Sequence, residues 1–176
     1  MFKILFLIIL IVGSFTECGK ADPPRPTPPP AQQSAVKTEA PKPADRICLQ
    51  AGLGDTLETW VACYGKPHRD NGTLKNFRGD DIVVVFADNR AINISFQNTS
   101  LGTVPPYADG MYPKDAKYGP VEETNDGVIR KVTKTGQSVL LKKYAPNTGG
   151  NFVVITQYDA KTDKYLGTTA GYSRYN

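Results

Sequence analysis

The stretch "GDTLETWVACYGKP", from Gly54 to Pro67, predicts a short helix with defined ends. Asp55 is a natural N-cap, and Glu58 three residues later completes the pattern of a capping box. Gly65 can adopt the left-handed conformation that ends a helix, and Pro67 cannot continue one. Apolar residues recur at helical spacing along one face: Leu57, Trp60, Val61 and Tyr64. We therefore expect an amphipathic helix that packs its tryptophan into a core.

Three segments with strand character follow this helix, separated by turn residues. They are "TLKNFR" (73–78), "IVVVFA" (82–87) and "AINISFQ" (91–97). Gly79-Asp80 and Asp88-Asn89 stand between them, and connections this short join antiparallel neighbours. Residues 46–97 thus predict an α+β fold, in which a short helix packs on an antiparallel β-meander.

The second half of the chain is predicted to be mostly β. Residues 98–127 show no sustained periodicity and are expected to form a long loop. Residues 128–176 contain the strand candidates "VIRKV", "NFVVITQYD" and "KYLGTTAGYSRY", and "SVLLKKY" fits either a short helix or a strand. "GQSVLLKKYAP" followed by "FVVITQYD" echoes the helix and strand of the first half, so this region is also a candidate degenerate repeat.

The long loop carries the candidate partner-binding residues. Aromatic and sulfur-containing side chains interleave there with Pro and Gly, a composition that suits contact surfaces. The candidates are Tyr107, Met111, Tyr112 and Tyr118. The alternative is a loop that packs its own aromatic rings over the edge of the sheet.

The N-terminus, residues 1–21, predicts export. "MFKILFLIILIV" has one Lys followed by an apolar run, the layout of a secretory signal peptide. The run is short for a bilayer span, which needs about 20 apolar residues, so an uncleaved anchor is the less favoured alternative. Cys18 stands where a bacterial lipoprotein carries its lipidated cysteine, although Glu17 replaces the small residue expected before it. Cleavage by ordinary signal peptidase is the alternative to lipidation.

Residues 22–45 predict a disordered tether. The segment has eight prolines and no aromatic residue, so it cannot bury enough apolar surface to offset its ordering entropy. In polyproline II form it could extend roughly 70 Å. Such a spacer would hold a folded domain away from a membrane surface.

Export to an oxidising compartment favours a disulfide between Cys48 and Cys63. A bridge over this short loop would stabilise the fold by about 3 kcal/mol in the chain-entropy model. The alternative is a pair of buried thiols that act as small hydrophobic groups.

The sequence offers no catalytic, metal or cofactor motif. It lacks a phosphate loop, a dinucleotide fingerprint and zinc-ligand spacing, and His68 is its one histidine. From Asp45 onward 16 Lys and Arg face 14 Asp and Glu, so nucleic acid is not an expected partner. We expect a non-enzymatic protein without cofactors.

Residues 46–97 resemble the SmpA/BamE-like envelope lipoproteins, whose fold also occurs in the β-lactamase inhibitor proteins. Gly54, Thr56, Gly65 and Pro67 fall at the spacing of that family, and "IVVVFADNRAINISF" resembles its hairpin. Trp60 and the tyrosine four residues later depart from the usual Val and Leu. The resemblance implies a small domain used for protein–protein contact.

Together these features predict an exported, membrane-tethered protein-binding module of the bacterial cell envelope, located in the periplasm or at the cell surface. Its partner would be another envelope or secreted protein. The alternatives are an inhibitor or immunity-type protein acting on a secreted enzyme and, less favoured, a cell-wall glycan binder or hydrolase.

Overall fold

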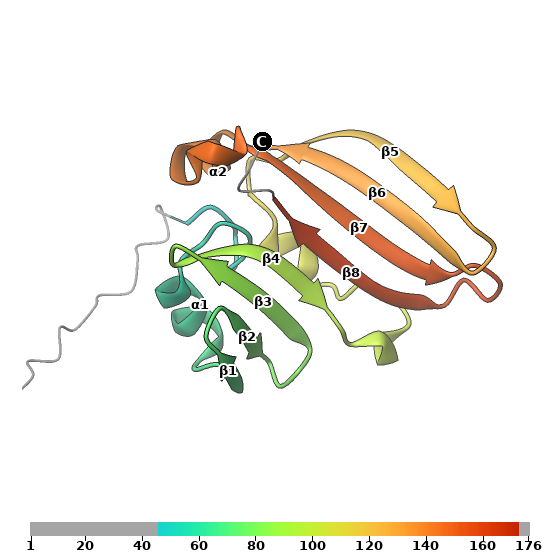
Figure 1. The fold of residues 1–176 in the computed structure, drawn as a ribbon, viewed down its shortest axis with the longest axis horizontal. Coiled ribbons are helices and arrows are strands. Elements are labelled where there is room, and N and C mark those ends of the chain that lie inside the picture. Colours follow the sequence, from blue (N-terminus) through green and yellow to red (C-terminus); the bar gives the residue numbers. More distant parts are fainter. Residues whose placement is uncertain (1–45, 173–176) are drawn as a thin grey trace, which may run out of the picture. The chain divides into compact units, whose positions relative to one another are not determined.

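The computed structural model describes residues 46–172, which form one α+β unit. Its eight strands build a single antiparallel sheet in the order β1-β2-β3-β4-β8-β7-β6-β5 (Figure 1). The predicted signal, the proline-rich tether and Cys18 lie outside these residues. Within residues 46–172, no helix is both long enough and apolar enough to cross a membrane.

The first half of the unit is the predicted helix and meander, with one additional strand. Its elements are α1 (Leu57–Tyr64), β1 (Arg69–Asn71), β2 (Leu74–Phe77), β3 (Ile82–Ala87) and β4 (Arg90–Phe96). The helix ends at Gly65, which has a φ of 78° as expected of a C-terminal glycine. Strand β1 is three exposed residues long, and its sequence carries no apolar alternation that would reveal it.

The N-cap of α1 is Thr56, so the assignment of this role to Asp55 was wrong. The Thr56 hydroxyl accepts a hydrogen bond from the backbone N–H of Thr59, at 3.4 Å. The Asp55 carboxylate is buried and accepts from two other backbone donors, Ile47 at 2.8 Å and Gly52 at 3.0 Å. It therefore fixes the segment before the helix rather than the helix end.

The second half begins with two short 3-10 helices, η2 (Thr99–Leu101) and η3 (Ala108–Met111). The regular elements that follow are β5 (Lys117–Asn125), β6 (Ile129–Gln137), α2 (Val139–Tyr144), η4 (Pro146–Thr148), β7 (Asn151–Asp159) and β8 (Tyr165–Gly171). The prediction of a long loop over residues 98–127 was wrong for its last part, which forms strand β5. All nine of its residues are exposed, so the strand lacks the alternation of a half-buried strand.

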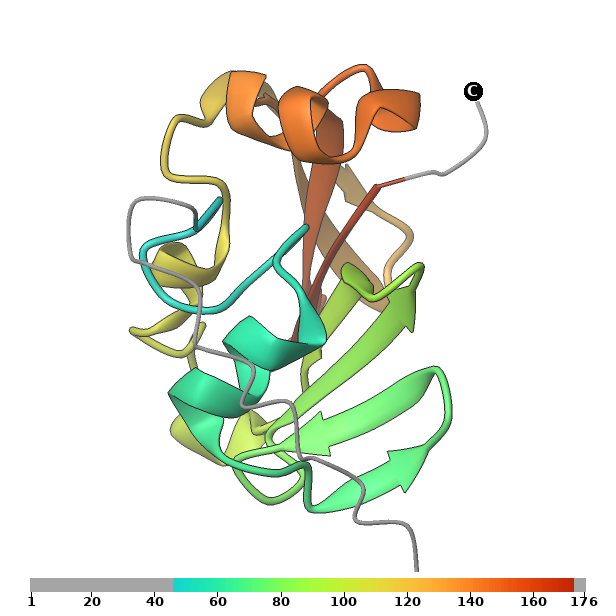
Figure 2. The same ribbon diagram turned by 90° about the vertical axis from the view of Figure 1, so that its left-hand side faces the viewer.

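The two halves meet where β4 pairs with β8. On each side of this junction a helix precedes a hairpin: α1 precedes β3–β4, and α2 precedes β7–β8. Helix α1 and segment 98–116 lie on one face of the sheet, and α2 lies across its end with Leu141 in the same core (Figure 2). A degenerate repeat would produce this arrangement, and the repeat itself remains a prediction.

The core lies between that face and its covering elements. Trp60 is 0% exposed, and its ring packs at 5.1 Å from the ring of Phe77. Its indole N–H donates to the carbonyl of Gly52 at 3.1 Å. A Cβ at Gly52 would lie 2.1 Å from the carbonyl oxygen of Met111, so this close approach of two backbones requires glycine.

Candidate functional site

Most of the predicted partner-binding residues lie in or near the core. Met111 is 0% exposed and Tyr112 is 6% exposed, so these two side chains are core residues and present no contact surface. Tyr107 is half-buried beneath Arg78, whose guanidinium carbon lies 4.6 Å from the ring centroid. Only Tyr118 is well exposed, at 47%. The loop packs its own aromatic side chains, as the alternative interpretation expected.

Both thiols of the predicted disulfide are free, so the bridge is not formed. The Sγ of Cys48 is buried and donates to the carbonyl oxygens of Met111 at 3.2 Å and Leu53 at 3.4 Å. Cys63 lies half-buried on α1. Cys48 belongs to segment 47–53, which is hydrogen-bonded to residues 110–114, for example from the N–H of Gln50 to the carbonyl of Gly110. Cys48 therefore packs against this segment, whereas Cys63 is on α1.

The face of the sheet opposite the helices is the candidate site. Within residues 46–172, no helix or loop packs over it (Figure 2). On β3 the side chains alternate between buried and half-buried, because the core covers one face only. We call the other face the open face. Across the sheet, its side chains form rows set by the strand register.

Two rows cross the centre of the open face. Pairing places Thr135, Val153, Gly171, Asn93 and Val85 in one row. It places Glu122, Thr133, Ile155, Thr169, Ser95 and Val83 in the next. In these two rows the one charged side chain is on β5, at the edge of the sheet. The centre is built from hydroxyl, amide and aliphatic groups.

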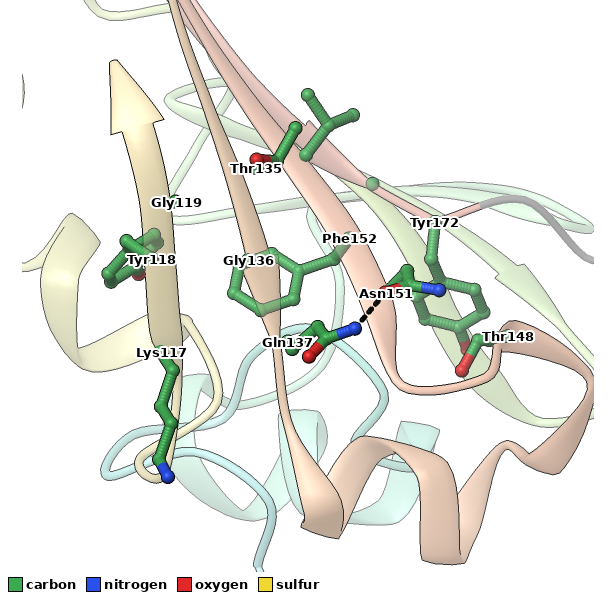
Figure 3. Close-up of a pocket in the computed structure, with 12 residues that line it drawn as sticks. Lys117, Tyr118, Gly119, Thr135, Gly136, Gln137, Thr148, Asn151, Phe152 and Tyr172 are labelled. Carbon is green, nitrogen blue, oxygen red and sulfur yellow. Dashed lines mark hydrogen bonds between the residues drawn. The ribbon is translucent and has the colours of Figure 1, made fainter.

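A hollow of about 610 Å³ opens where the first of these rows meets the α2 end of the sheet. A third row, Lys117, Gln137 and Asn151, forms one side of it, and the Nε2 of Gln137 donates to the Oδ1 of Asn151 at 3.1 Å (Figure 3). Lys117 lies at one end of the hollow, and Tyr172 lies at the other.

Glycines create this hollow because they leave part of its floor without side chains. Gly119 and Gly171 line it on the open face. Gly136 also lines it, but a Cβ there would point to the other face of the sheet and lie 2.3 Å from the ring of Phe152. Phe152 in turn packs edge-on against Tyr118, with 5.8 Å between ring centroids. The shape of the hollow is therefore fixed by the packing beneath it.

A second hollow of about 610 Å³ lies further along the open face, at the η2 end. Its lining includes Ser95, Gln97, Ile155, Leu166 and Thr169. The two hollows adjoin along β7, since Val153 lines the first and Ile155 lines the second. Both hollows open on the same face of the sheet, along β7 and β8.

The chemistry of this surface suits binding. The residues that line the first hollow include amides, hydroxyls, aromatic rings and the ammonium of Lys117, but no carboxylate. Among residues 46–172, no cluster of three or more His, Cys, Asp or Glu side chains could hold a metal ion. Pockets of a few hundred Å³ with a few oriented polar groups are typical ligand or anchor sites.

Sequence reasoning did not identify the open face. The alternation of "NFVVITQYD" shows that β7 has one buried side and one side with Val153 and Ile155. Nothing local shows that β8 and β4 extend this surface, because their pairing joins residues about 75 positions apart.

Comparison with known proteins identifies no relative: no family model, no curated protein and no solved structure matches the chain. The resemblance of residues 46–97 to the SmpA/BamE-like lipoproteins therefore remains a prediction from the sequence.

Proposed function

We propose that this chain is an exported, membrane-tethered and non-enzymatic protein-binding module of the bacterial cell envelope. Its contact surface is the open face of the sheet. The N-terminal apolar segment, Cys18 and the proline-rich residues 22–45 support export and tethering.

The observation that carries the proposal is the distribution of charge on the open face. Its two central rows have a single charged residue, Glu122, and this residue lies on the edge strand. Protein interfaces have centres depleted of charge and polar rims, which matches this pattern. Half-buried Val153 and Ile155 supply the apolar component at the centre.

The partner fitted to this face has an uncharged centre and one protruding side chain. The hollow beside Gly119 and Gly171 would receive that side chain, since its volume exceeds that of a single aromatic residue. Gln137 and Asn151 would offer amide hydrogen bonds at its rim. A few well-buried anchor side chains supply most of the binding energy in protein interfaces.

Site-specific photocrosslinking in living cells tests the proposal. A photoreactive amino acid is placed at Thr169 on the open face and, as a matched control, at Val128, which is 69% exposed in the β5–β6 turn. Thr169 is expected to give one defined protein adduct in the envelope fraction, and Ile155→Lys in the same chain is expected to abolish it. Val128 is expected to give none.

Equal adducts from both positions, or none from Thr169, would refute the assignment of the face. Recovery of the chain from the cytosol with its N-terminal segment intact would refute the proposed location. The two results are independent of each other.

A second candidate function is favoured by the composition of the first hollow. Amides, hydroxyls and a tyrosine ring can bind the hydroxyls and the C–H faces of a sugar, so a cell-wall glycan is a ligand of matching chemistry. Soluble wall fragments would then raise the melting temperature of the protein, and Asn151→Ala would remove the increase. Unchanged melting at millimolar fragment would exclude this function.

A further inference from the structure

Strand β5 is the longer of the two edge strands of the sheet. It is the outermost strand, pairs only with β6 and has nine residues that are all exposed. The opposite edge, β1, is only three residues long. A long exposed edge presents unpaired N–H and C=O groups that can template another strand. The sheet therefore has one edge that is long enough for strand addition.

Of the charged side chains on β5, one forms an ion pair within the described part of the chain and two do not. Glu123 pairs with Arg130 of the neighbouring strand, at 3.3 Å. Lys117 and Glu122 take part in none of the ion pairs found within residues 46–172. The strand thus carries one unpaired positive and one unpaired negative side chain.

Strand β5 also carries two exposed apolar side chains. Tyr118 is 47% exposed and Val121 is 57% exposed. Singly exposed apolar residues are common on protein surfaces. Here two exposed apolar side chains lie on an edge strand, next to two charged side chains without an ion-pair partner within residues 46–172. A second strand added at this edge would cover all four.

A bulge at Gly119-Pro120 decides which side chains share a face. Tyr118 pairs with Gly136 and Val121 pairs with Lys134, so two residues of β5 stand opposite the single residue between these partners. The bulge therefore places Tyr118 and Val121 on the helix-bearing face. Lys117 precedes Tyr118 and Glu122 follows Val121, so the side chains of Lys117 and Glu122 are both on the open face.

We propose that β5 pairs with β5 of a second copy of this chain, antiparallel across a two-fold axis between Gly119 and Pro120. In this register Lys117 stands opposite Glu122 of the partner subunit, and Tyr118 stands opposite Val121 of the partner subunit. Two-fold symmetry makes each pair occur twice. Opposite charges and aromatic–aliphatic pairs across neighbouring strands are both stabilising.

The alternative registers lack this match. A slip of one residue opposes side chains from different faces, which a continuous sheet forbids. A slip of two residues sets Glu122 against Asp115 of the partner subunit in one direction and against Gly119 of the partner subunit in the other. Only the proposed register pairs both unpaired charges and both exposed apolar residues.

The resulting dimer is a continuous sheet whose two open faces lie on the same side. A contact of one strand is at the low end of interface size, so the dimer is weak, with a dissociation constant between about 1 µM and 1 mM. The pairing uses the edge and leaves the centre of the open face free for another protein.

Sedimentation velocity of the full chain over a concentration series tests this register. Non-ionic detergent shields its apolar N-terminal segment. Lys117→Glu alone and Glu122→Lys alone each create two like-charge pairs, and each is expected to weaken dimerisation by about tenfold or more. The double variant exchanges the charges and is expected to return the dissociation constant to within about threefold of the original.

Lys131→Glu is the matched control for Lys117→Glu. It makes the same change of charge on β6, one strand inside the edge, and is expected to change dimerisation by less than about twofold. A protein that stays monomeric at the highest concentration reached would overturn the proposal. So would failure of the double variant to restore dimers, or equal weakening by Lys131→Glu.

Discussion

Replacement of Asp55 by alanine is expected to lower the free energy of unfolding by about 3 kcal/mol, because two buried backbone donors lose their acceptor. The carboxylate is 3% exposed and accepts from the N–H groups of Ile47 and Gly52, at 2.8 and 3.0 Å. A buried donor without a partner costs about 1–3 kcal/mol, so two cost about 2–6 kcal/mol. The variant also loses the cost of burying a carboxylate, which offsets part of this destabilisation. Burial raises the pKa of Asp55 because it disfavours the charged form.

Thermal unfolding followed by circular dichroism measures the effect. A loss of about 3 kcal/mol corresponds to a fall in melting temperature of about 9 °C for a domain of this size. Glu58→Ala is the matched control, because this carboxylate is exposed and accepts from the exposed side chain of Asn89. Its removal is expected to cost about 0.5 kcal/mol. Equal shifts for the two variants would refute the view that Asp55 holds the segment before α1.

Three further outcomes are expected. Gly136→Ala should destabilise the fold by about 1–3 kcal/mol in chemical denaturation, because its Cβ would meet the ring of Phe152; an unchanged midpoint would contradict this. The stability advantage of the wild type over Asp55→Asn should be greatest below pH 3.8, the ordinary pKa, and should shrink as pH rises through the raised pKa, as measured by urea unfolding at several pH values. A thiol reagent should label Cys63 in the native protein and Cys48 only after unfolding, because Cys48 is buried and burial raises its pKa; equal labelling rates in mass spectrometry would contradict the structure.

The elements that could be predicted from the sequence are those with a local signal. The period of the apolar residues in α1 and the alternation in β3, β4 and β7 reflect burial on one face, and these elements formed where expected. The α+β class and the antiparallel sheet are confirmed on this basis. Strand β5 was missed because it is exposed on both faces and interrupted by a bulge.

The candidate site depended on information that no local pattern contains. Met111 and Tyr112 have the composition of a contact loop, yet segment 47–53 binds beside them and makes them part of the core. The predicted N-cap was wrong by one residue because Asp55 and Thr56 both have side chains that suit this position. The Asp55 carboxylate accepts hydrogen bonds from the buried N–H groups of segment 47–53 instead. The open face exists only once β4 and β8 have paired.

The position of β8 has a consequence for how this protein is made. The final strand of the unit lies in the middle of the sheet, bonded to β4 on one side and to β7 on the other. The two parts of the sheet, β1–β4 and β5–β7, cannot join until β8 has been synthesised, so the sheet stays incomplete while the chain is growing. In the proposed export through a translocation channel, this delay would keep the sheet open until β8 has passed.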